Sequence, residues 1–178
     1  KLILGYEGNF EKAKIRTFDG NIEVKNVVTK VIDKDSVMVW YQPSVKDSIR
    51  VSVTQDSYNK EFNVRLKEQK NDSLVLNPRY SSSLPLREIF ALKSGTPLVS
   101  IDSTKISVRS QDSSTQKFTV NYDDFQMELK VDFGREPLEK YKIQFLPGAV
   151  IDFYGAKNDT ITYAVSTRNT SDYGNLRV

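Results

Sequence analysis

Hydrophobic and polar residues alternate along most of the chain with a period of two, which is the pattern of a β-strand that buries one face. The clearest example is residues 125–133, where five apolar positions alternate with four polar or charged ones. Residues 49–53 and 62–66 alternate in the same way and predict a hairpin that turns at residues 56–59. Further strands are predicted at residues 13–17, 22–32, 37–41, 118–122, 141–145 and 161–165. Helical spacing hardly occurs, so the pattern predicts an all-β protein.

The alternation is interrupted at residues 77–85, where two prolines and three serines occur together. This break predicts two tandem immunoglobulin-like (Ig-like) β-sandwich domains, because each half is near the size of such a sandwich and turn residues recur every 8 to 12 residues or so. The alternative is a long loop within one domain, and residues 86–92 fit either a strand or one helical turn. The predicted division is a first sandwich at 1–77, a linker at 78–84, a second sandwich at 85–170, and the start of a following domain or strand at 171–178.

The composition removes much of the enzyme chemistry that operates at neutral pH. The 178 residues contain no His and no Cys, which excludes Ser-His-Asp and Cys-His nucleophile pairs, zinc sites built on imidazole or thiolate, and disulfides. Glycine-rich phosphate loops are also absent from the sequence. A glycosidase would need two carboxylates across a cleft, which small sandwiches seldom have. We therefore expect a protein that is not an enzyme and uses no cofactor.

The charge distribution does not indicate a nucleic-acid partner, and the apolar runs do not indicate a membrane span. Lys and Arg number 26 against 23 Asp and Glu, and the two populations are interspersed, unlike the basic stripe of a nucleic-acid-binding domain. Basic runs at residues 12–16 and 65–67 alternate with apolar positions, which predicts solvated strand exteriors that discourage edge-to-edge pairing. The alternative is an acidic partner surface. No apolar run approaches the roughly 18 residues of a membrane span, so we expect no membrane-spanning segment in this fragment.

A resemblance to a known family comes from residues 141–155, YKIQFLPGAVIDFYG, and residues 158–167, NDTITYAVST. They resemble the bacterial Ig-like domains of S-layer proteins and of Bacteroidota cell-surface lipoproteins, in which a strand ends in a PGA turn, a single helical turn carries DxxG, and a final strand closes in ST. The residues also have physical roles of their own. Pro147 stops the strand, Gly148 and Gly155 permit positive φ, and Asp152 is suited to accept backbone N–H bonds.

The resemblance covers roughly residues 84–170 and implies an exported protein of the cell envelope, at the outer-membrane surface or in the periplasm. The chain begins at Lys1 without an initiator Met, so we expect a piece of a longer protein whose lipid anchor, if it has one, lies outside this fragment. A partner is then expected among envelope or outer-membrane proteins.

Asp followed by Ser or Thr, and then by an apolar residue or Thr, occurs at five places. The pattern resembles the O-glycosylation acceptor of exported Bacteroidota proteins, although Asp and Ser are also favoured turn formers before a strand. The candidate acceptors are Ser36, Ser48, Ser73, Ser103 and Thr160. Three Asn-x-Ser/Thr sequons, at Asn71, Asn158 and Asn169, would matter only in a eukaryotic secretory setting, and we interpret them as accidental.

Two further groups of residues suggest binding. The acidic pairs Asp123 with Asp124, Asp33 with Asp35, and Asp152 with Asp159 are potential Ca²⁺ ligands, but no D-x-D-x-D-G loop is present and solvated turn carboxylates are the favoured interpretation. The aromatic residues Trp40, Tyr41, Tyr6, Phe10, Tyr58 and Tyr154 would suit a sugar-stacking platform. Strand 37–41 is apolar on both faces, however, which favours a central strand with Trp40 buried.

The leading hypothesis is a non-catalytic structural or protein-interaction module of an exported bacterial envelope protein, acting as a scaffold or assembly subunit. The alternatives are a carbohydrate-binding module of a polysaccharide-processing system and a Ca²⁺-stabilised adhesin or S-layer unit. Burial of Trp40 would argue against the carbohydrate-binding module.

Overall fold

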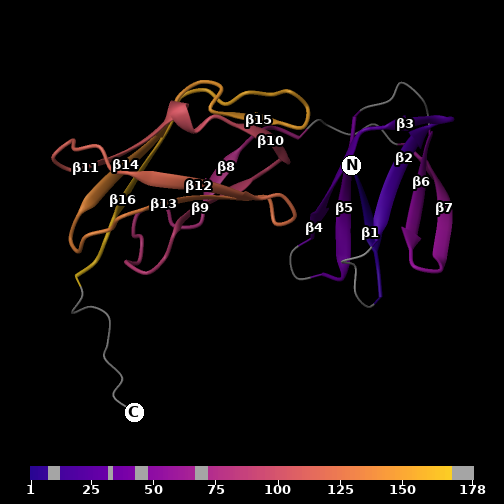
Figure 1. The fold of residues 1–178 in the computed structure, drawn as a ribbon, viewed down its shortest axis with the longest axis horizontal. Coiled ribbons are helices and arrows are strands. Elements are labelled where there is room, and N and C mark those ends of the chain that lie inside the picture. Colours follow the sequence, from indigo (N-terminus) through magenta and orange to yellow (C-terminus); the bar gives the residue numbers. More distant parts are fainter. Residues whose placement is uncertain (8–12, 32–33, 43–47, 67–71, 170–178) are drawn as a thin grey trace, which may run out of the picture. The chain divides into compact units, whose positions relative to one another are not determined.

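The computed structural model describes residues 1–7, 13–31, 34–42, 48–66 and 72–169. The chain divides into two compact units, Lys1–Asn71 and Asp72–Val178, and both consist of antiparallel strands (Figure 1). One 3-10 turn, η1 (Ser103–Lys105), is the only helical element of the described residues. Those residues include no helix long and apolar enough to cross a membrane. The predicted all-β class is confirmed.

The first unit contains two sheets, one with the strand order β1-β5-β4 and the other with the order β3-β2-β6-β7. Their strands are β1 (Leu2–Gly5), β2 (Lys14–Asp19), β3 (Ile22–Val24), β4 (Asn26–Lys30), β5 (Ser36–Tyr41), β6 (Ser48–Gln55) and β7 (Tyr58–Arg65). The predicted hairpin is present as β6 and β7, and it closes at the Gln55–Tyr58 pair across a two-residue turn.

The core of the first unit lies between its two sheets. Val37 and Val39 of β5 pack in one cluster with Val51 of β6 and Ile15 of β2. Because strand side chains alternate between faces, Trp40 lies on the opposite face of β5, where it is only 1% exposed. β5 is therefore a central strand with buried residues on both faces, as the sequence predicted.

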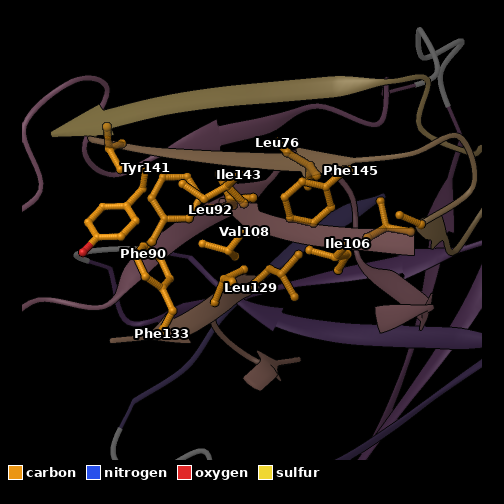
Figure 2. Close-up of a cluster of buried hydrophobic side chains, with 14 of the residues drawn as sticks. Leu76, Phe90, Leu92, Ile106, Val108, Leu129, Phe133, Tyr141, Ile143 and Phe145 are labelled. Carbon is orange, nitrogen blue, oxygen red and sulfur yellow. The ribbon is translucent and has the colours of Figure 1, made fainter. Parts of the chain in front are cut away.

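The second unit contains a four-stranded sheet of order β12-β13-β9-β8, a three-stranded sheet of order β11-β14-β16, and the pair β10-β15. Its strands are β8 (Leu76–Pro78), β9 (Phe90–Ser94), β10 (Leu98–Ile101), β11 (Ile106–Ser110), β12 (Phe118–Asp123), β13 (Glu128–Phe133), β14 (Lys140–Phe145), β15 (Val150–Asp152) and β16 (Ile161–Ser166). Side chains from the larger two sheets meet in one core, including Leu92, Leu129, Val108 and Ile143 (Figure 2).

Two predicted strands have different limits in the structure. The strand predicted at residues 125–133 begins at Glu128, because β12 and β13 pair as far as Asp123 and Glu128 and the chain turns between them with Met127 at φ 52°. The strand predicted at residues 22–32 is divided into β3 and β4, which belong to different sheets. Of the two interpretations of residues 86–92, the strand holds from Phe90 onward as β9.

The structure places the division between the units before Asp72, whereas the sequence suggested a linker at residues 78–84. Pro78 ends β8, which pairs with β9. The Arg79 N–H donates to the Ala91 carbonyl at 2.9 Å, and the Leu84 N–H donates to the Ser166 carbonyl at 2.9 Å. A proline is tolerated here because β8 is an edge strand. Residues 171–178 lie outside the described residues.

Tyr163 of β16 packs its ring in the core of the second unit, and its hydroxyl makes a hydrogen bond to a backbone carbonyl. Its ring centroid lies 5.5 Å from that of Phe90 and 6.1 Å from that of Phe145. The hydroxyl donates to the Leu76 carbonyl oxygen at 2.8 Å. Burial raises the pKa of Tyr163 from 10 to about 12, so the folded chain favours the neutral phenol.

This pKa predicts an alkaline loss of stability that depends on Tyr163. The raised pKa stabilises the fold fully below pH 10, and that contribution is lost as the pH rises from 10 towards 12. Tyr163→Phe should cost about 1 kcal/mol at neutral pH, because the Leu76 carbonyl loses its donor, but should lose less stability than the wild type between pH 10 and pH 12. Urea unfolding of both proteins across that range measures the difference, and equal losses would contradict the assignment.

Candidate functional site

A buried carboxylate organises the turn that follows β15. Asp152 is 1% exposed, and its Oδ1 accepts hydrogen bonds from the backbone N–H groups of Tyr154 (2.9 Å) and Ala156 (2.8 Å). Its Oδ2 accepts from the hydroxyl of Thr96 at 2.9 Å, and Thr96 is itself fully buried. The Gly155 N–H donates to the Asp152 carbonyl, and Gly155 has φ +86°. The predicted role of Asp152 as an acceptor of backbone N–H bonds is confirmed.

The resemblance implied a helical turn at DxxG, and the structure corrects this. Residues 153 and 154 form a turn closed by the Gly155 N–H, which donates to the Asp152 carbonyl at 3.0 Å, and Gly155 at φ +86° cannot continue a right-handed helix. Gly148 has φ +71°, and β14 ends at Phe145, two residues before Pro147. Gly148 therefore adopts the predicted positive φ, and strand β14 ends before Pro147 as predicted.

Asn158 fixes the other side of the same loop. It is 5% exposed, its Nδ2 donates to the Leu146 carbonyl at 2.9 Å, and its Oδ1 accepts from the Val150 N–H at 2.8 Å. The Asn158 side chain, which is the Asn of one of the three sequons, is therefore buried and holds the loop in place. Thr96 and Asn158 did not emerge from the sequence as loop-fixing residues. The available signal was their position beside turn residues, since Asn and Thr there often bond to backbone groups.

The acidic pairs do not form a metal centre among the described residues, in which no group of three or more potential ligands occurs. Asp152 is committed to its own turn. Asp123 Oδ1 accepts the Gln126 N–H at 2.8 Å and so closes the β12–β13 turn. Asp35 and Asp159 are exposed, and Asp33 lies outside the described residues. The described carboxylates of these pairs therefore stabilise turns or face solvent.

The aromatic residues do not form a platform around Trp40. The Trp40 Nε1–H donates to the Thr29 hydroxyl at 2.8 Å, inside the protein, and Tyr41 is also buried. Tyr6 packs against the first core, and Tyr154 packs edge-on against Phe153 at 5.3 Å. Tyr58 is exposed, and Phe10 lies outside the described residues. Burial of Trp40 argues against a sugar-stacking site built on it.

The five candidate glycan acceptors differ in accessibility. Ser36, the first residue of β5, is only 7% exposed. The remaining four are exposed, namely Ser48, Ser73, Ser103 and Thr160. At Asp102-Ser103, the Asp102 side chain also caps η1 by accepting the Thr104 N–H at 3.1 Å. A hydrogen bond from the Thr104 hydroxyl lowers the pKa of Asp102, so this Asp has a turn-forming role whether or not Ser103 is modified.

The outer face of the sheet β3-β2-β6-β7 carries most of the predicted basic exterior. Lys14 and Arg16 of β2 are exposed, as the alternation predicted. The Arg50 guanidinium lies 4.5 Å from the Phe18 ring centroid, and it contacts both carboxylate oxygens of Glu61 at 2.9 and 3.0 Å. This arrangement is solvated and leaves an ordered charged surface beside the edge strand β7.

A hollow of about 410 Å³ lies beside the β12–β13 hairpin. Its lining residues are Lys117, Phe118, Thr119, Asp132, Phe133 and Gly134. Asp132 is already paired with Arg135 at 3.0 Å. Asp132 is the one carboxylate of the lining, and it lies opposite Thr119 in the register of β12 and β13.

Comparison with models of known protein families and with curated protein sequences finds no match. The functional interpretation therefore depends on the geometry above and on the residues of the loop around Asp152.

Truncation of Asp152 tests whether its carboxylate is structural. Asp152→Ala leaves the N–H groups of Tyr154 and Ala156 and the buried Thr96 hydroxyl without their acceptor, and we expect it to lower the free energy of unfolding by about 2 kcal/mol. The matched control is Asp159→Ala, whose exposed side chain should change stability by less than about 0.5 kcal/mol. Urea unfolding of both variants supplies the values. Similar stabilities for the two variants would contradict a structural role for Asp152.

Proposed function

We propose that this chain is a non-catalytic structural and protein-interaction module of an exported bacterial envelope protein, built from two Ig-like β-sandwich domains. The observation that carries the proposal is the use of the buried polar groups of the second unit. Asp152, Thr96 and Asn158 are bonded to one another's loops or to backbone groups, and a catalytic or metal site would need such groups directed at a ligand. The hydrogen bonds of these three side chains hold loops in place.

A scaffold needs stiff units, and the second unit has several devices that stiffen its loops. Asp152 and Asn158 fix the two sides of the loop between β14 and β16. The Thr167 hydroxyl accepts the Glu139 N–H at 3.1 Å, which ties the end of β16 to the start of β14. Stiff sandwiches hold neighbouring domains at a set distance, while their loops and sheet edges remain available to a partner.

The resemblance of residues 141–167 to bacterial Ig-like domains supports an envelope location and an envelope or outer-membrane protein as partner. Because sandwich folds host many functions, the partner is identified by a direct search in the native envelope.

A mild-detergent pull-down of the full-length protein from its native envelope, followed by mass spectrometry, carries out that search. We expect a membrane or surface protein in stoichiometric amount. The control bait is the full-length protein with Asp152→Ala, which should lose partners that dock on the second unit through its loops. Recovery of the bait alone would overturn the interaction proposal, and a glycan-binding panel would then be the next experiment.

We also propose that the accessible Asp-Ser and Asp-Thr sites are the glycan acceptors of the exported protein. Peptide mass spectrometry of protein from native cells should find added mass on at least some of Ser48, Ser73, Ser103 and Thr160. Ser36 is an internal control, because it has the same local sequence but is buried, and it should be unmodified. Asp102→Ala should remove the added mass from Ser103. Unmodified peptides at all four exposed sites, or added mass on Ser36, would contradict this assignment.

A further inference from the structure

Strand β7 is a long edge strand of the first unit as far as the described residues show. It is the last strand in the order β3-β2-β6-β7, and β6 is its partner among the described strands. Seven of its eight residues are exposed. Phe62 is directly opposite Val51 in the register and so lies on the core-facing side of the sheet, yet it is 41% exposed. The opposing sheet thus leaves part of the inner face of β7 uncovered.

The hairpin register determines which backbone groups of β7 are available. The two-residue turn closes at the hydrogen-bonded Gln55–Tyr58 pair, and hydrogen-bonded and non-hydrogen-bonded pairs then alternate along an antiparallel ladder. The N–H and C=O groups of Phe62 and Val64 consequently point towards β6. Those of Glu61, Asn63 and Arg65 point away from the sheet, where a new strand would find them.

The residues 61–65, EFNVR, are complementary to themselves when two copies run antiparallel. If the two-fold axis passes through Asn63, Glu61 of each copy lies opposite Arg65 of the other, and Phe62 lies opposite Val64. Directly opposed pairs of opposite charge and of apolar side chains stabilise an antiparallel ladder. Arg65 is exposed and makes no ion pair with a described residue. Glu61 already contacts Arg50 of β6 at 2.9 and 3.0 Å but its side chain is 52% exposed, so Arg65 of a second copy would add a second cation to this carboxylate.

The neighbouring registers that keep the same faces together are less complementary. A two-fold axis at Glu61 would place the two Glu61 carboxylates opposite each other, and like charges in that position are destabilising. An axis at Phe62 would pair Glu61 with Asn63 and leave Arg65 opposite Asn59, so no opposite charges would meet. A two-fold axis at Val64 would leave only residues 63–65 paired within β7, so among the registers that keep residues 61–65 paired within the strand the charges favour the axis at Asn63.

We infer that the β7 edge binds a second copy of this chain by antiparallel pairing centred on Asn63, which joins the two four-stranded sheets into one. This inference deepens the proposed function, on which it rests in taking protein contact as the role of the module, and it names the partner as the chain itself. The paired segment is short and buries little area, so we expect a weak dimer with a Kd of roughly 0.1 mM.

Cysteine crosslinking tests both the pairing and its register, because the chain has no other thiol. In the inferred dimer the two copies of residue 63 form a hydrogen-bonded pair with Cα atoms about 5.5 Å apart, which is within the span of a disulfide. Asn63→Cys should therefore form a disulfide dimer under mild oxidation. Asn59→Cys is the matched control, because it alters the same residue type on the same exposed strand. Its two copies would be about 27 Å apart.

Preferential crosslinking of Asn63→Cys over Asn59→Cys at equal concentration supports the inference. Equal crosslinking of the two variants, or none of either, overturns it. Circular dichroism of both reduced variants establishes that each is folded before oxidation.

Charge reversal gives a second test that does not use cysteine. Arg65→Glu would place two acidic groups opposite each other twice in a homodimer, and Glu61→Lys would do the same with basic groups. Each variant alone should bind itself at least about tenfold more weakly than the wild type. An equimolar mixture of the two variants should regain association, because opposite charges meet again at both positions. Sedimentation equilibrium measures all three samples, and failure of the mixture to associate better than either variant overturns the inference.

The same variants separate this inference from the proposed function. A chain that stays monomeric up to about ten times the expected Kd, yet still captures an envelope protein in the pull-down, overturns self-pairing and leaves the interaction role intact. If that capture is lost in Arg65→Glu, the edge accepts a strand of another protein and self-pairing is again overturned. A monomeric chain that captures nothing overturns both proposals.

Discussion

Packing of one apolar sheet face against another is the constraint on which both units depend. A strand in which apolar and polar residues alternate buries its apolar face against another sheet. Its other face must either be polar and face solvent or be covered by a further element. In the second unit this brings Leu92 and Leu129 of one sheet against Val108 and Ile143 of the other. The positions of turns, charges and loops follow from that packing, because each polar residue between buried ones is directed outward. Burial of apolar area supplies the dominant favourable free energy of such a fold.

The sequence predicted those strands in which apolar and polar residues alternate strictly. The pattern of β13 is strict, and its buried residues Leu129, Val131 and Phe133 are those predicted. In β6 the predicted residues Ile49 and Val51 are buried, but so is Ser52 on the opposite face. The pattern was weak for β10 and β15, which are short and pair mainly with each other, so their burial depends on partners distant in sequence. It also could not show that the continuous run of residues 22–32 changes sheets at Lys25, because β3 and β4 are each apolar in part. Periodicity reports burial along one strand and does not report the neighbour that causes it.

In the candidate site, too, some residue roles were predictable from the local sequence and others were not. The roles of Gly148, Gly155 and Asp152 were predictable because they follow from local backbone geometry within a few residues. The contribution of Thr96 was not predictable, since its hydroxyl reaches Asp152 from 56 residues away in the sequence. Trp40 is an instructive intermediate case. Its burial was inferred from apolar residues on both faces of one strand, but its partner Thr29 belongs to the next strand in the sheet and became known only from the register.

Antiparallel sheets that bury their cores still have open edges, and the edge strands of the two units differ in sequence. In the second unit the edge strand β8 ends in Pro78, and a proline removes a donor that an added strand would use. The edge strand β7 has no proline and instead carries Glu61, Lys60 and Arg65. Charges on an edge oppose pairing in every register that sets like against like, but they favour the register in which opposite charges meet. The same residues therefore oppose pairing in the registers that set like charges together, and they favour the proposed alignment about Asn63 over those registers.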